Sequence, residues 1–495
     1  MTEPSSSRPV LIAADALTGT PSALDQNALR ELVRATADLV RTRVRDLKPG
    51  TALAIALRNS VQAVALQFAA EELGLVPLPL APRSDHTALR AAARSSGATV
   101  LAHLSPGPAA RLEIEKLPDS EPFAEPDPDW GLAISTSGST GSGTTVFLSR
   151  TALVRNARAF ADRTGLGAEA RYLVTAPLWH VGGSVVGLRA ALASGAVLLL
   201  PPEAKPGILA EWVDRYRPTH LAGVPTVLFD LLGKRSGPSA ADGWPGQIIT
   251  GGMAVEGTLV GALHALGSRV TVLYGMTEFT NAVLSARIDP GFLPPTGFVG
   301  RPFPGVECRI EPVAGQSREA EPYGHLLARG YPQAAAVVRD GRPRPLETDA
   351  DGWYRTGDLA RATADGYVIV GRSRDMVIRG GVNICAATLV DAARRTLRAK
   401  EAVVQALPSE RLGEDIALIV HGPSGEECRS LQRDFLAQLP HGTRPGYLIV
   451  SRSPLPRTAN DKYDLAGMYR RTVALVRPGD AASSGLPIVS VDHWS

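Results

Sequence analysis

The sequence predicts an α/β protein with a large N-terminal domain, made of layered α/β subdomains plus a β-rich subdomain, and a small α+β C-terminal domain. Three observations carry this prediction. From about Ala28 helical stretches alternate with short apolar runs, beyond Gly300 the chain changes to short strands and turns, and after residues 371–375 it restarts as strand, helix and strand. The alternation is typical of helices layered on a mostly parallel sheet.

The layered part begins with a helix and continues through short buried strands. Residues 28–47 have apolar positions at helical spacing, and residues 51–57, "TALAIAL", are typical of a buried strand. Further strands of this kind are predicted at residues 170–178, 195–202, 218–225, 246–252 and 268–275. The last two runs end in glycine, and ligands of open α/β sheets bind at such carboxyl ends of strands.

The later part of the chain predicts the β-rich subdomain and then the small domain. Short strands are predicted at residues 306–313, 324–330 and 366–372, and residues 386–400 and 402–408 predict a helix and a strand. We therefore divide the chain into an N-terminal domain of residues 1–372 and a C-terminal domain of residues 373–495, a length that suits a small domain.

The composition is that of a folded protein with a small-molecule ligand. The chain has 495 residues, and its 52 basic and 49 acidic residues form no basic run that would indicate a nucleic-acid or membrane partner. Cys308, Cys385 and Cys428 lie far apart, which argues against a disulfide framework or a zinc site and favours a reducing compartment. The first ten residues have no signal-peptide pattern, and the longest apolar run, residues 193–202, is too short to span a bilayer. We expect a cytoplasmic protein.

Residues 135–145, "STSGSTGSGTT", have the glycine spacing of a phosphate-binding loop, but Thr144 stands where such a loop carries lysine. Composition alone favours a flexible linker. The run lies between the apolar segments "GLAIST" and "VFLSR", which predicts a tight turn between two strands. Hydroxyl and backbone N–H groups in such a turn can bind an anion.

With its flanks this loop, "TSGSTGSGTTVFLS", resembles the phosphate loop of the adenylate-forming superfamily, which includes acyl- and aryl-CoA ligases, peptide-synthetase adenylation domains and luciferases. The usual form there is T-S-G-[ST]-T-G-x-P-K, and the chain departs from it at Gly143 and Thr144. The family's other motifs follow in order: "PLWHVGG" (177–183), "TGGM" (250–253), "YGMTE" (274–278), "YRTGDLA" (354–360), "GRSRDMVIRGGVNI" (371–384) and "LPRTANDKYDL" (455–465). The motifs are most similar in style to those of bacterial acyl- and aryl-CoA ligases.

The resemblance implies a site for ATP and Mg²⁺. Adenylation needs an acid oxygen to attack the α-phosphorus while pyrophosphate leaves, so charge on the phosphates must be stabilised. By resemblance Glu278 is the metal ligand, Thr277 donates to phosphate, and Asp358 and Arg372 bind the ribose; taken alone, Glu278 would be a solvated loop carboxylate and Asp358 a turn residue. The expected nucleotide-binding residues are Thr136, Ser137, Gly138, Ser139, Thr140, Gly141, Thr144, Gly251, Gly252, Met253, Tyr274, Asp358 and Arg372.

Lys462 occupies the catalytic-lysine position of the last motif that the resemblance identifies. The chain has only six lysines against 46 arginines, so this placement is informative. A compact ammonium on a flexible stem suits a group that bridges the α-phosphate and the attacking oxygen. By composition alone a solvated surface lysine would be the default interpretation.

The resemblance also places an acid pocket beside the nucleotide. His180 resembles the histidine that lies next to the bound acid, although without the other motifs a core histidine would be the better interpretation. Gly182, Gly183, Gly275, Asn281 and Ala282 would line a small to medium pocket with one polar group, that of Asn281. Such a pocket suits an aryl or cinnamoyl-type acid better than a long alkyl chain.

The family's small domain rotates about a hinge in the segment that "GRSRD" resembles, so the resemblance implies a mobile C-terminal domain with the hinge at Arg374. One orientation brings the catalytic lysine to the site and the other, near "RGGVNI", builds the thiol tunnel. After that motif Ala386 and Thr388 replace the usual proline and glutamate.

We therefore expect an ATP-dependent ligase that adenylates a small aromatic or cinnamoyl-type carboxylic acid and passes the acyl group to coenzyme A. An acyl carrier protein is the alternative acceptor, and nitrite activation that gives a diazo product from an aryl amine is an alternative chemistry. A decayed ligase that serves as a nucleotide-binding scaffold is the alternative outside enzymes.

Overall fold

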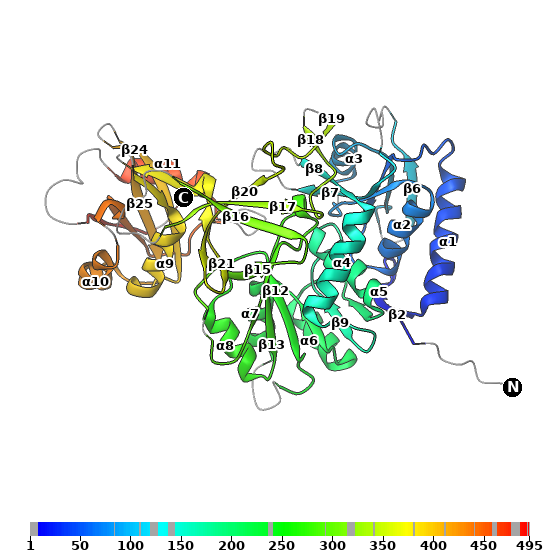
Figure 1. Cartoon of the computed structure of the whole chain (residues 1–495), viewed down its shortest axis with the longest axis horizontal. Helices are drawn as coiled ribbons and strands as arrows, with labels where there is room; N and C mark the ends of the chain where they lie inside the picture. The colour runs from blue at the N-terminus through cyan, green and yellow to red at the C-terminus, as the bar shows by residue number, and fades with distance from the viewer. Residues whose placement is uncertain are drawn as a thin grey trace. The chain divides into compact units, whose positions relative to one another are not determined.

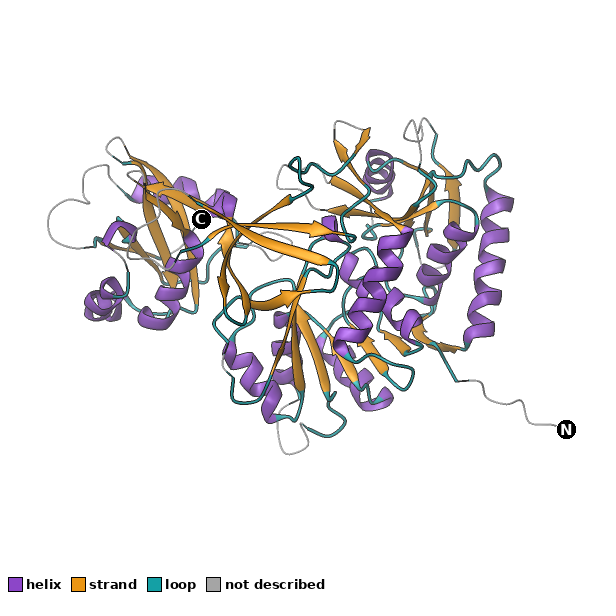
Figure 2. Cartoon of the chain, viewed as in Figure 1, coloured by secondary structure: helices purple, strands orange, loops and turns teal. Residues whose placement is uncertain are grey.

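The computed structural model describes residues 8–83, 85–107, 110–118, 127–136, 144–235, 241–292, 294–313, 322–339, 342–379, 382–409, 412–439, 441–457, 463–476, 486–492 and 494. The chain forms two compact units. Unit 1 comprises Met1–Cys308 and Ala328–Tyr354, and unit 2 comprises Arg309–Leu327 and Arg355–Ser495. Helices and strands alternate in both units, and the predicted α/β class is confirmed (Figures 1 and 2).

The largest sheet of unit 1 contains nine strands in the order β2-β1-β10-β9-β11-β12-β13-β14-β15. Strands β1, β10, β9, β11, β12 and β13 are parallel, and β2, β14 and β15 are antiparallel to their neighbours. The bounds are β1 Leu11–Ala14, β2 Pro21–Leu24, β9 Arg171–Val174, β10 Val197–Leu200, β11 His220–Ala222, β12 Gln247–Gly251, β13 Arg269–Tyr274, β14 Leu284–Ile288 and β15 Phe298–Pro302.

Helices on this sheet follow from capping residues and from apolar stripes that face the strands. α4 begins after Ser149, whose hydroxyl accepts from the Ala152 N–H, and ends at Gly165 in the left-handed conformation. Strand β10 is buried along its whole length, as a parallel strand covered on both faces should be. The helices of this layer are α4 Arg150–Thr164, α5 Ala190–Ser194, α6 Pro206–Tyr216, α7 Pro225–Lys234 and α8 Gly257–Ala265, with the π-helix η1 Gly182–Arg189 before α5 and the short 3₁₀-helix η2 Thr277–Phe279 after β13 (Figure 1).

Two smaller sheets complete unit 1. One has the order β4-β3-β5-β6, with β3 parallel to β4 and β5, and the other has the antiparallel order β19-β18-β8-β7. Their bounds are β3 Ala52–Ala56, β4 Val76–Pro79, β5 Ala98–Leu104, β6 Leu112–Lys116, β7 Trp130–Thr136, β8 Thr144–Ser149, β18 Ala336–Arg339 and β19 Arg342–Arg344; the helices here are α1 Gln26–Arg43, α2 Val61–Glu72 and α3 His86–Ser95. Side chains from both sheets, such as Leu78 and Phe147, share one buried cluster.

Four neighbouring strands, β16-β17-β20-β21, lie wholly or in part in unit 2, which also contains a sheet in the order β23-β22-β25-β26-β27, with β24 antiparallel to β25. The strand bounds are β16 Val306–Pro312, β17 Gly324–Gly330, β20 Tyr354–Thr363, β21 Gly366–Arg372, β22 Met376–Arg379, β23 Val382–Cys385, β24 Glu401–Ser409, β25 Gly413–His421, β26 Tyr447–Ser451 and β27 Ile488–Val491. The helices are α9 Ala386–Leu397, α10 Gly425–Ala437 and α11 Leu465–Leu475, with 3₁₀-helices η3 Ser373–Asp375 and η4 His441–Thr443.

The predicted elements are present, and their ends differ for local reasons. The helix predicted at residues 28–47 ends at Arg43, because Val44 adopts an extended conformation. The helix predicted at residues 386–400 ends at Leu397, because Arg398 adopts the left-handed conformation that ends many helices. Strand β9 ends at Val174, four residues before the predicted run does, and the remaining residues begin a loop that matters for the site.

The predicted boundary after Arg372 falls inside unit 2, between β21 and η3. The domain division at that point and the hinge at Arg374 therefore stay predictions. No helix in the part of the chain that the structure describes is both long enough and apolar enough to cross a bilayer.

Candidate functional site

The phosphate-loop motif lies between two paired strands, as predicted. β7 and β8 are antiparallel, Thr136 is opposite Thr144, and the Thr136 hydroxyl donates to the Thr144 carbonyl oxygen at 3.1 Å. The predicted ATP-binding residues Ser137, Gly138, Ser139, Thr140 and Gly141 lie outside the described residues. Strand pairing thus fixes the residues at both ends of the motif, and its binding of phosphate stays a prediction.

The predicted adenine-side loop follows β12 at the carboxyl edge of the parallel strands. A Cβ atom on Gly251 would lie 1.9 Å from the Leu273 carbonyl oxygen, so only glycine fits between β12 and β13. Gly252 has a φ of 79°, which also favours glycine, and Met253 is exposed. The loop is therefore held next to the end of β13, where Tyr274 begins the next motif.

That next motif, residues 274–282, is a tight turn closed on itself. The Asn281 N–H donates to the Met276 carbonyl oxygen at 3.0 Å, and the Val283 N–H donates to that of Tyr274 at 3.0 Å. A Cβ atom on Gly275 would lie 1.2 Å from the Asn281 carbonyl oxygen. The backbone crosses itself so closely here that no residue larger than glycine fits at position 275.

Two consecutive residues of this turn, Thr280 and Asn281, have positive φ angles of 51° and 83°. Such strain in residues other than glycine persists only where the surroundings hold it, and it is common at active sites. The buried Thr280 hydroxyl donates to the Pro332 carbonyl oxygen at 2.7 Å, and the Ala334 N–H donates to the Glu278 carbonyl oxygen at 2.8 Å. The segment before β18 therefore clamps the turn from outside.

Thr277 and Glu278 lie in the 3₁₀-helix η2 within this turn, and both are half-buried. The Glu278 carboxylate makes no hydrogen bond or ion pair with the described residues. The assignment of Glu278 as the metal ligand stays a prediction. Among the described residues no cluster of three or more His, Cys, Asp or Glu side chains could hold a metal.

The "PLWHVGG" loop runs from β9 into the π-helix η1. The His180 side chain is exposed, and its carbonyl oxygen accepts from the N–H groups of Gly183 and Ser184, each at 3.0 Å. A Cβ atom on Gly183 would lie 2.1 Å from the Pro177 carbonyl oxygen, so glycine is required for this reversal. π-Helical turns are rare and often occur at functional sites.

The loop and the turn meet at the predicted acid pocket. A Cβ atom on Gly182 would lie 3.5 Å from Asn281 Nδ2, an ordinary contact distance. Gly275 touches the backbone of both Asn281 and Ala282 through the crossing described above. The structure thus brings together Gly182, Gly275, Asn281 and Ala282 from segments almost one hundred residues apart in sequence.

Sequence reasoning missed the residues that hold this loop from behind. Asn59 is 4% exposed; its Nδ2 donates to the Ala176 carbonyl oxygen at 3.3 Å, and its Oδ1 accepts from the Leu178 N–H at 2.9 Å. Gln67, fully buried on α2, donates to the Ser184 hydroxyl at 3.1 Å. Asn59 carries no motif, and its partners are more than one hundred residues away, so no sequence pattern indicates this role.

Asn156 and Thr280 were also missed. The Asn156 side chain is buried on α4 and donates to the Ala282 carbonyl oxygen at 3.2 Å. A buried Asn in an otherwise apolar helix face was a signal that could have been noticed, because buried amides require partners. Thr280 gave no such signal, since threonine is not a usual left-handed residue.

The predicted ribose-binding residues lie together in unit 2. Asp358 on β20 is directly opposite Arg372 on β21, and the guanidinium Nε is 2.7 Å from Asp358 Oδ1. The Asp358 side chain is 3% exposed and that of Arg372 is 55% exposed. The buried Thr356 hydroxyl accepts from the Asp358 N–H at 3.1 Å and donates to the Leu326 carbonyl oxygen at 2.8 Å. This strand pair holds the carboxylate in place.

Two further predicted residues are not placed by the structure. Lys462 lies outside the described residues, and of Arg374 only the backbone, within η3, is described. After β23 the substituted positions Ala386 and Thr388 begin α9, where the Thr388 hydroxyl donates to the Cys385 carbonyl oxygen at 2.7 Å.

The chain has the same fold as solved adenylate-forming enzymes, with their large N-terminal and small C-terminal domains. ATP-bound MatB from Rhodopseudomonas palustris matches with a TM-score of 0.76 and 22% identity over 95% of this chain and 97% of that one. The o-succinylbenzoate CoA synthetase MenE from Bacillus subtilis, in complex with its acyl-adenylate intermediate, matches with a TM-score of 0.72 and 21% identity over 94% and 96%. The likeness shows the fold.

Sequence comparison adds the family. The model of the AMP-binding enzyme family matches residues 14–336, and the chain belongs to that family. It is 30% identical over 353 residues to the mitochondrial medium-chain acyl-CoA ligase ACSF2 of Macaca fascicularis and 31% identical over 341 residues to the indoleacetate–CoA ligase of Aromatoleum aromaticum. These stretches cover 69% and 67% of this chain, but only 57% and 65% of the relatives. The resemblance to the adenylate-forming superfamily is confirmed.

Proposed function

We propose that the chain is an ATP-dependent ligase that adenylates a small carboxylic acid and transfers the acyl group to coenzyme A. Family membership and the names of the relatives, a medium-chain acyl-CoA ligase and an indoleacetate–CoA ligase, support this activity. The structural observation that carries the proposal is the turn of residues 274–282. It holds Glu278, the proposed cation ligand, and Asn281, a proposed residue of the acid pocket, three residues apart in one hydrogen-bonded turn.

The chemistry needs that proximity. A carboxylate oxygen of the acid bonds to the α-phosphorus of ATP, the bond from that phosphorus to the bridging oxygen breaks, and pyrophosphate leaves. Mg²⁺, when bound, neutralises charge on the phosphates. Glu278 would hold the cation, Thr277 would donate to phosphate, and Lys462 would stabilise charge between the α-phosphate and the attacking oxygen. A rigid turn at residues 274–282 would keep the carboxylate oxygen of the acid close to the α-phosphorus and aligned with it.

In the second half-reaction the thiol sulfur of coenzyme A bonds to the acyl carbon, the acyl–phosphate bond breaks, AMP leaves, and the thiol proton is released. We propose that rotation about Arg374 separates the two half-reactions, with the small domain presenting Lys462 for the first and the face near residues 379–384 for the second. Asp358 and Arg372 would bind the ribose throughout, because their ion pair is already formed between adjacent strands.

The proposed acid is small and aromatic or of cinnamoyl type. Gly182 leaves space beside Asn281, whose amide offers one polar contact. The indoleacetate–CoA ligase, a relative, and the anthranilate CoA ligase AuaEII, a solved structure with a TM-score of 0.72 at 18% identity over 93% of this chain and 94% of that one, carry names of aryl-acid ligases. The medium-chain ligase among the relatives makes alkyl acids the necessary comparison in any test.

The test is pyrophosphate release with ATP and Mg²⁺ over a panel of benzoic, arylacetic, cinnamic and C6–C10 alkyl acids, followed by mass identification of products with coenzyme A. We expect faster pyrophosphate release with aryl acids than with alkyl acids, and an acyl-CoA as the product with coenzyme A. Lys462→Ala should lower pyrophosphate release by about 10²- to 10⁴-fold, the scale of a lost transition-state donor, while synthetic acyl-AMP is still converted to acyl-CoA.

Three results would contradict the proposal. Equal loss of both half-reactions in Lys462→Ala would remove the assigned role of that lysine. Pyrophosphate release without acyl-CoA, but with transfer to a phosphopantetheinylated carrier protein, would change the acceptor. A diazo product from nitrite and an amino-aryl acid, with no turnover of the carboxylic acids alone, would change the activated group while leaving the nucleotide site as assigned.

A further inference from the structure

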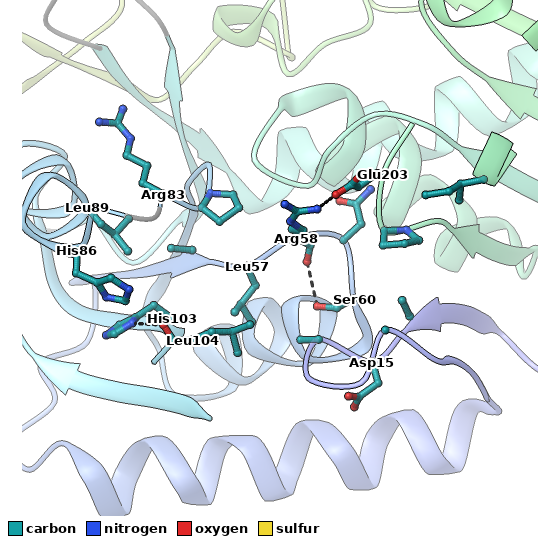
Figure 3. A pocket seen from close by; sticks show the side chains of 18 residues that line it. Asp15, Leu57, Arg58, Ser60, Arg83, His86, Leu89, His103, Leu104 and Glu203 are labelled. Atoms are coloured by element: carbon teal, nitrogen blue, oxygen red, sulfur yellow. Dashed lines mark hydrogen bonds and ion pairs between the residues drawn. The ribbon is translucent and has the colours of Figure 1, made fainter. Parts of the chain in front are cut away.

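Unit 1 contains a cavity that shares no residue with the proposed adenylation site. Its volume is about 390 Å³, within the range of small-molecule pockets, and 18 residues line it (Figure 3). They come from the turn between β1 and β2, the segment between β3 and α2, the start of α3, the end of β5 and the segment after β10. The proposed reaction gives this cavity no role.

The interior of the cavity is largely apolar. Leu57 lies near the centre of Figure 3 with Leu104 beside it, Leu89 lies next to His86, and Ile208 contributes from α6. Leu57 and Leu89 are nearly fully buried. The part of a ligand that fills this space must be apolar, because apolar walls offer no hydrogen-bond partners to a buried polar group.

The acidic groups on the wall already have partners. Asp15 accepts from the N–H groups of Leu17 and Thr18, each at 2.9 Å, and from the Gln62 side chain. Although burial opposes its charge, these hydrogen bonds lower the pKa of Asp15. Glu203 is paired with Arg58, as Figure 3 shows, and with the Lys205 ammonium at 2.6 Å. Neither carboxylate is available to attract a cationic ligand.

The unpartnered polar groups are instead donors. His86 and Arg83 make no hydrogen bond or ion pair with the described residues, and both line the cavity. The ring of His86 packs edge to face on His103, with centroids 4.9 Å apart. His103 is itself fixed, since its Nδ1 is 2.9 Å from the Leu104 carbonyl oxygen and its Nε2 is 3.2 Å from Glu115 Oε1.

We propose that this cavity is a binding site for a small carboxylate with an apolar body, such as an arylacetic or medium-chain acid, separate from the acid pocket of the adenylation site. The apolar walls take the body, and Arg83 and His86 donate to the carboxylate at the rim. An anion is preferred over a cation, because both carboxylates of the wall are already bound by hydrogen-bond donors or cations, whereas Arg83 and His86 remain as donors.

The cavity is connected to the acid pocket through one residue. Asn59 lines the cavity, and its amide makes the hydrogen bonds to Ala176 and Leu178 that hold the loop carrying His180. A ligand that restricts residues 57–60 therefore restricts that loop too. The site would let a carboxylate of the substrate's own class alter acid binding at a distance; this consequence, but not the binding itself, rests on the proposed function.

The probe is 4-(trifluoromethyl)phenylacetate, followed by ¹⁹F NMR and equilibrium dialysis on the full chain without ATP. We expect two bound populations. Ala16→Trp, which fills the cavity from its wall, should remove one, and Gly182→Phe, which fills the proposed acid pocket, should remove the other. The double variant Arg83→Gln/His86→Phe should weaken the cavity population at least about tenfold, the scale of a lost charge-assisted hydrogen bond, without filling space.

Arg30→Gln on α1 is the matched control, since Arg30 is exposed and does not line the cavity; it should change neither population. A single bound population that Gly182→Phe abolishes overturns the proposal, as does retention of both populations in folded Ala16→Trp and in the double variant. Displacement of the cavity population by coenzyme A also overturns it, because the cavity would then belong to the acceptor path. If no acid supports pyrophosphate release but two populations persist, the proposed function fails and this site stands.

Discussion

The residues proposed to bind the acid and those proposed to bind the ribose are positioned in different ways. On the acid side, in unit 1, position depends on the backbone: Gly275 crosses Asn281 with no room for a Cβ atom, Gly183 turns against Pro177, and Thr280 and Asn281 hold strained angles. On the ribose side, in unit 2, position depends on side chains, since Asp358 and Arg372 form an ion pair across two regular antiparallel strands.

The difference predicts how each side tolerates change. A backbone crossing either forms or does not. A Cβ atom that overlaps a carbonyl oxygen must push the backbone aside, and a shift of that size misplaces the reacting groups. A side-chain pair on regular strands loses only its own contacts when one member is replaced, and the strands remain. We therefore expect all-or-none effects on the acid side and graded effects on the ribose side.

The largest effect is expected for Gly275→Ala. The new methyl group would lie 1.2 Å from the Asn281 carbonyl oxygen, so the turn of residues 274–282 must open and move Glu278 with it. We expect pyrophosphate release to fall by more than about 100-fold, the cost of misplacing reacting groups by 1 Å, and the thermal midpoint to fall as well. A variant with half of the wild-type rate and an unchanged midpoint would show that the crossing is not required.

The matched control for this substitution is Gly261→Ala on α8. A Cβ atom there meets nothing within 4 Å, and Gly261 is not part of any motif. It should leave the rate unchanged and raise the midpoint slightly, because alanine is the better helix residue.

The contrast also explains what could be predicted from the sequence. The order of helices and strands followed from apolar periodicity, and the family resemblance named Asp358 and Arg372, which the structure places opposite each other on neighbouring strands. The family resemblance named Gly182, Gly275 and Asn281, and the structure brings them together.

The supports of the acid side could not be predicted. Asn59 bonds to backbone groups and Gln67 to the Ser184 hydroxyl, in each case more than one hundred residues away, and no local sequence pattern indicates such distant partners. No sequence pattern predicts the π-helix η1 either, because this helix follows from the reversal of the loop at Gly183. Such features depend on tertiary packing, and only the folded chain shows them.

The next effect in size is expected for Asp358→Ala on the ribose side. The KM for ATP should rise by about 10- to 100-fold, the scale of hydrogen bonds to a charged group, while the KM for the acid stays the same. The thermal midpoint should change little, because Arg372 is half exposed and regains water. A fall of the midpoint as large as that of Gly275→Ala would mean that the pair is structural and that the two sides are built alike.

A smaller effect on rate, but a clear one on stability, is expected for Asn59→Ala. It leaves the buried Ala176 carbonyl and Leu178 N–H without partners, which costs about 1–3 kcal/mol. Since Asn59 touches the loop rather than the substrate, the KM for the acid should rise by roughly tenfold at a nearly constant kcat, on the scale of that free energy. Asn59→Asp keeps the acceptor for Leu178 and should recover part of the KM; if kcat fell while KM held, a positioning role would be excluded.

The smallest effect is expected for Gly182→Ala, the one glycine of the acid side that has room. Its new methyl group would lie 3.5 Å from Asn281 Nδ2 and 3.7 Å from the Ala176 side chain, so the fold should accept it and the midpoint should hold. The methyl group enters the pocket instead, and one methylene in a pocket changes selectivity by about 10- to 200-fold at most. The ratio of kcat/KM for a cinnamic acid over a small benzoic acid should fall by several-fold within that range, with ATP kinetics unchanged. An equal fall of kcat/KM for every acid would show that position 182 supports the loop and does not line the pocket. Gly182 would then act through the backbone, as Gly183 and Gly275 do.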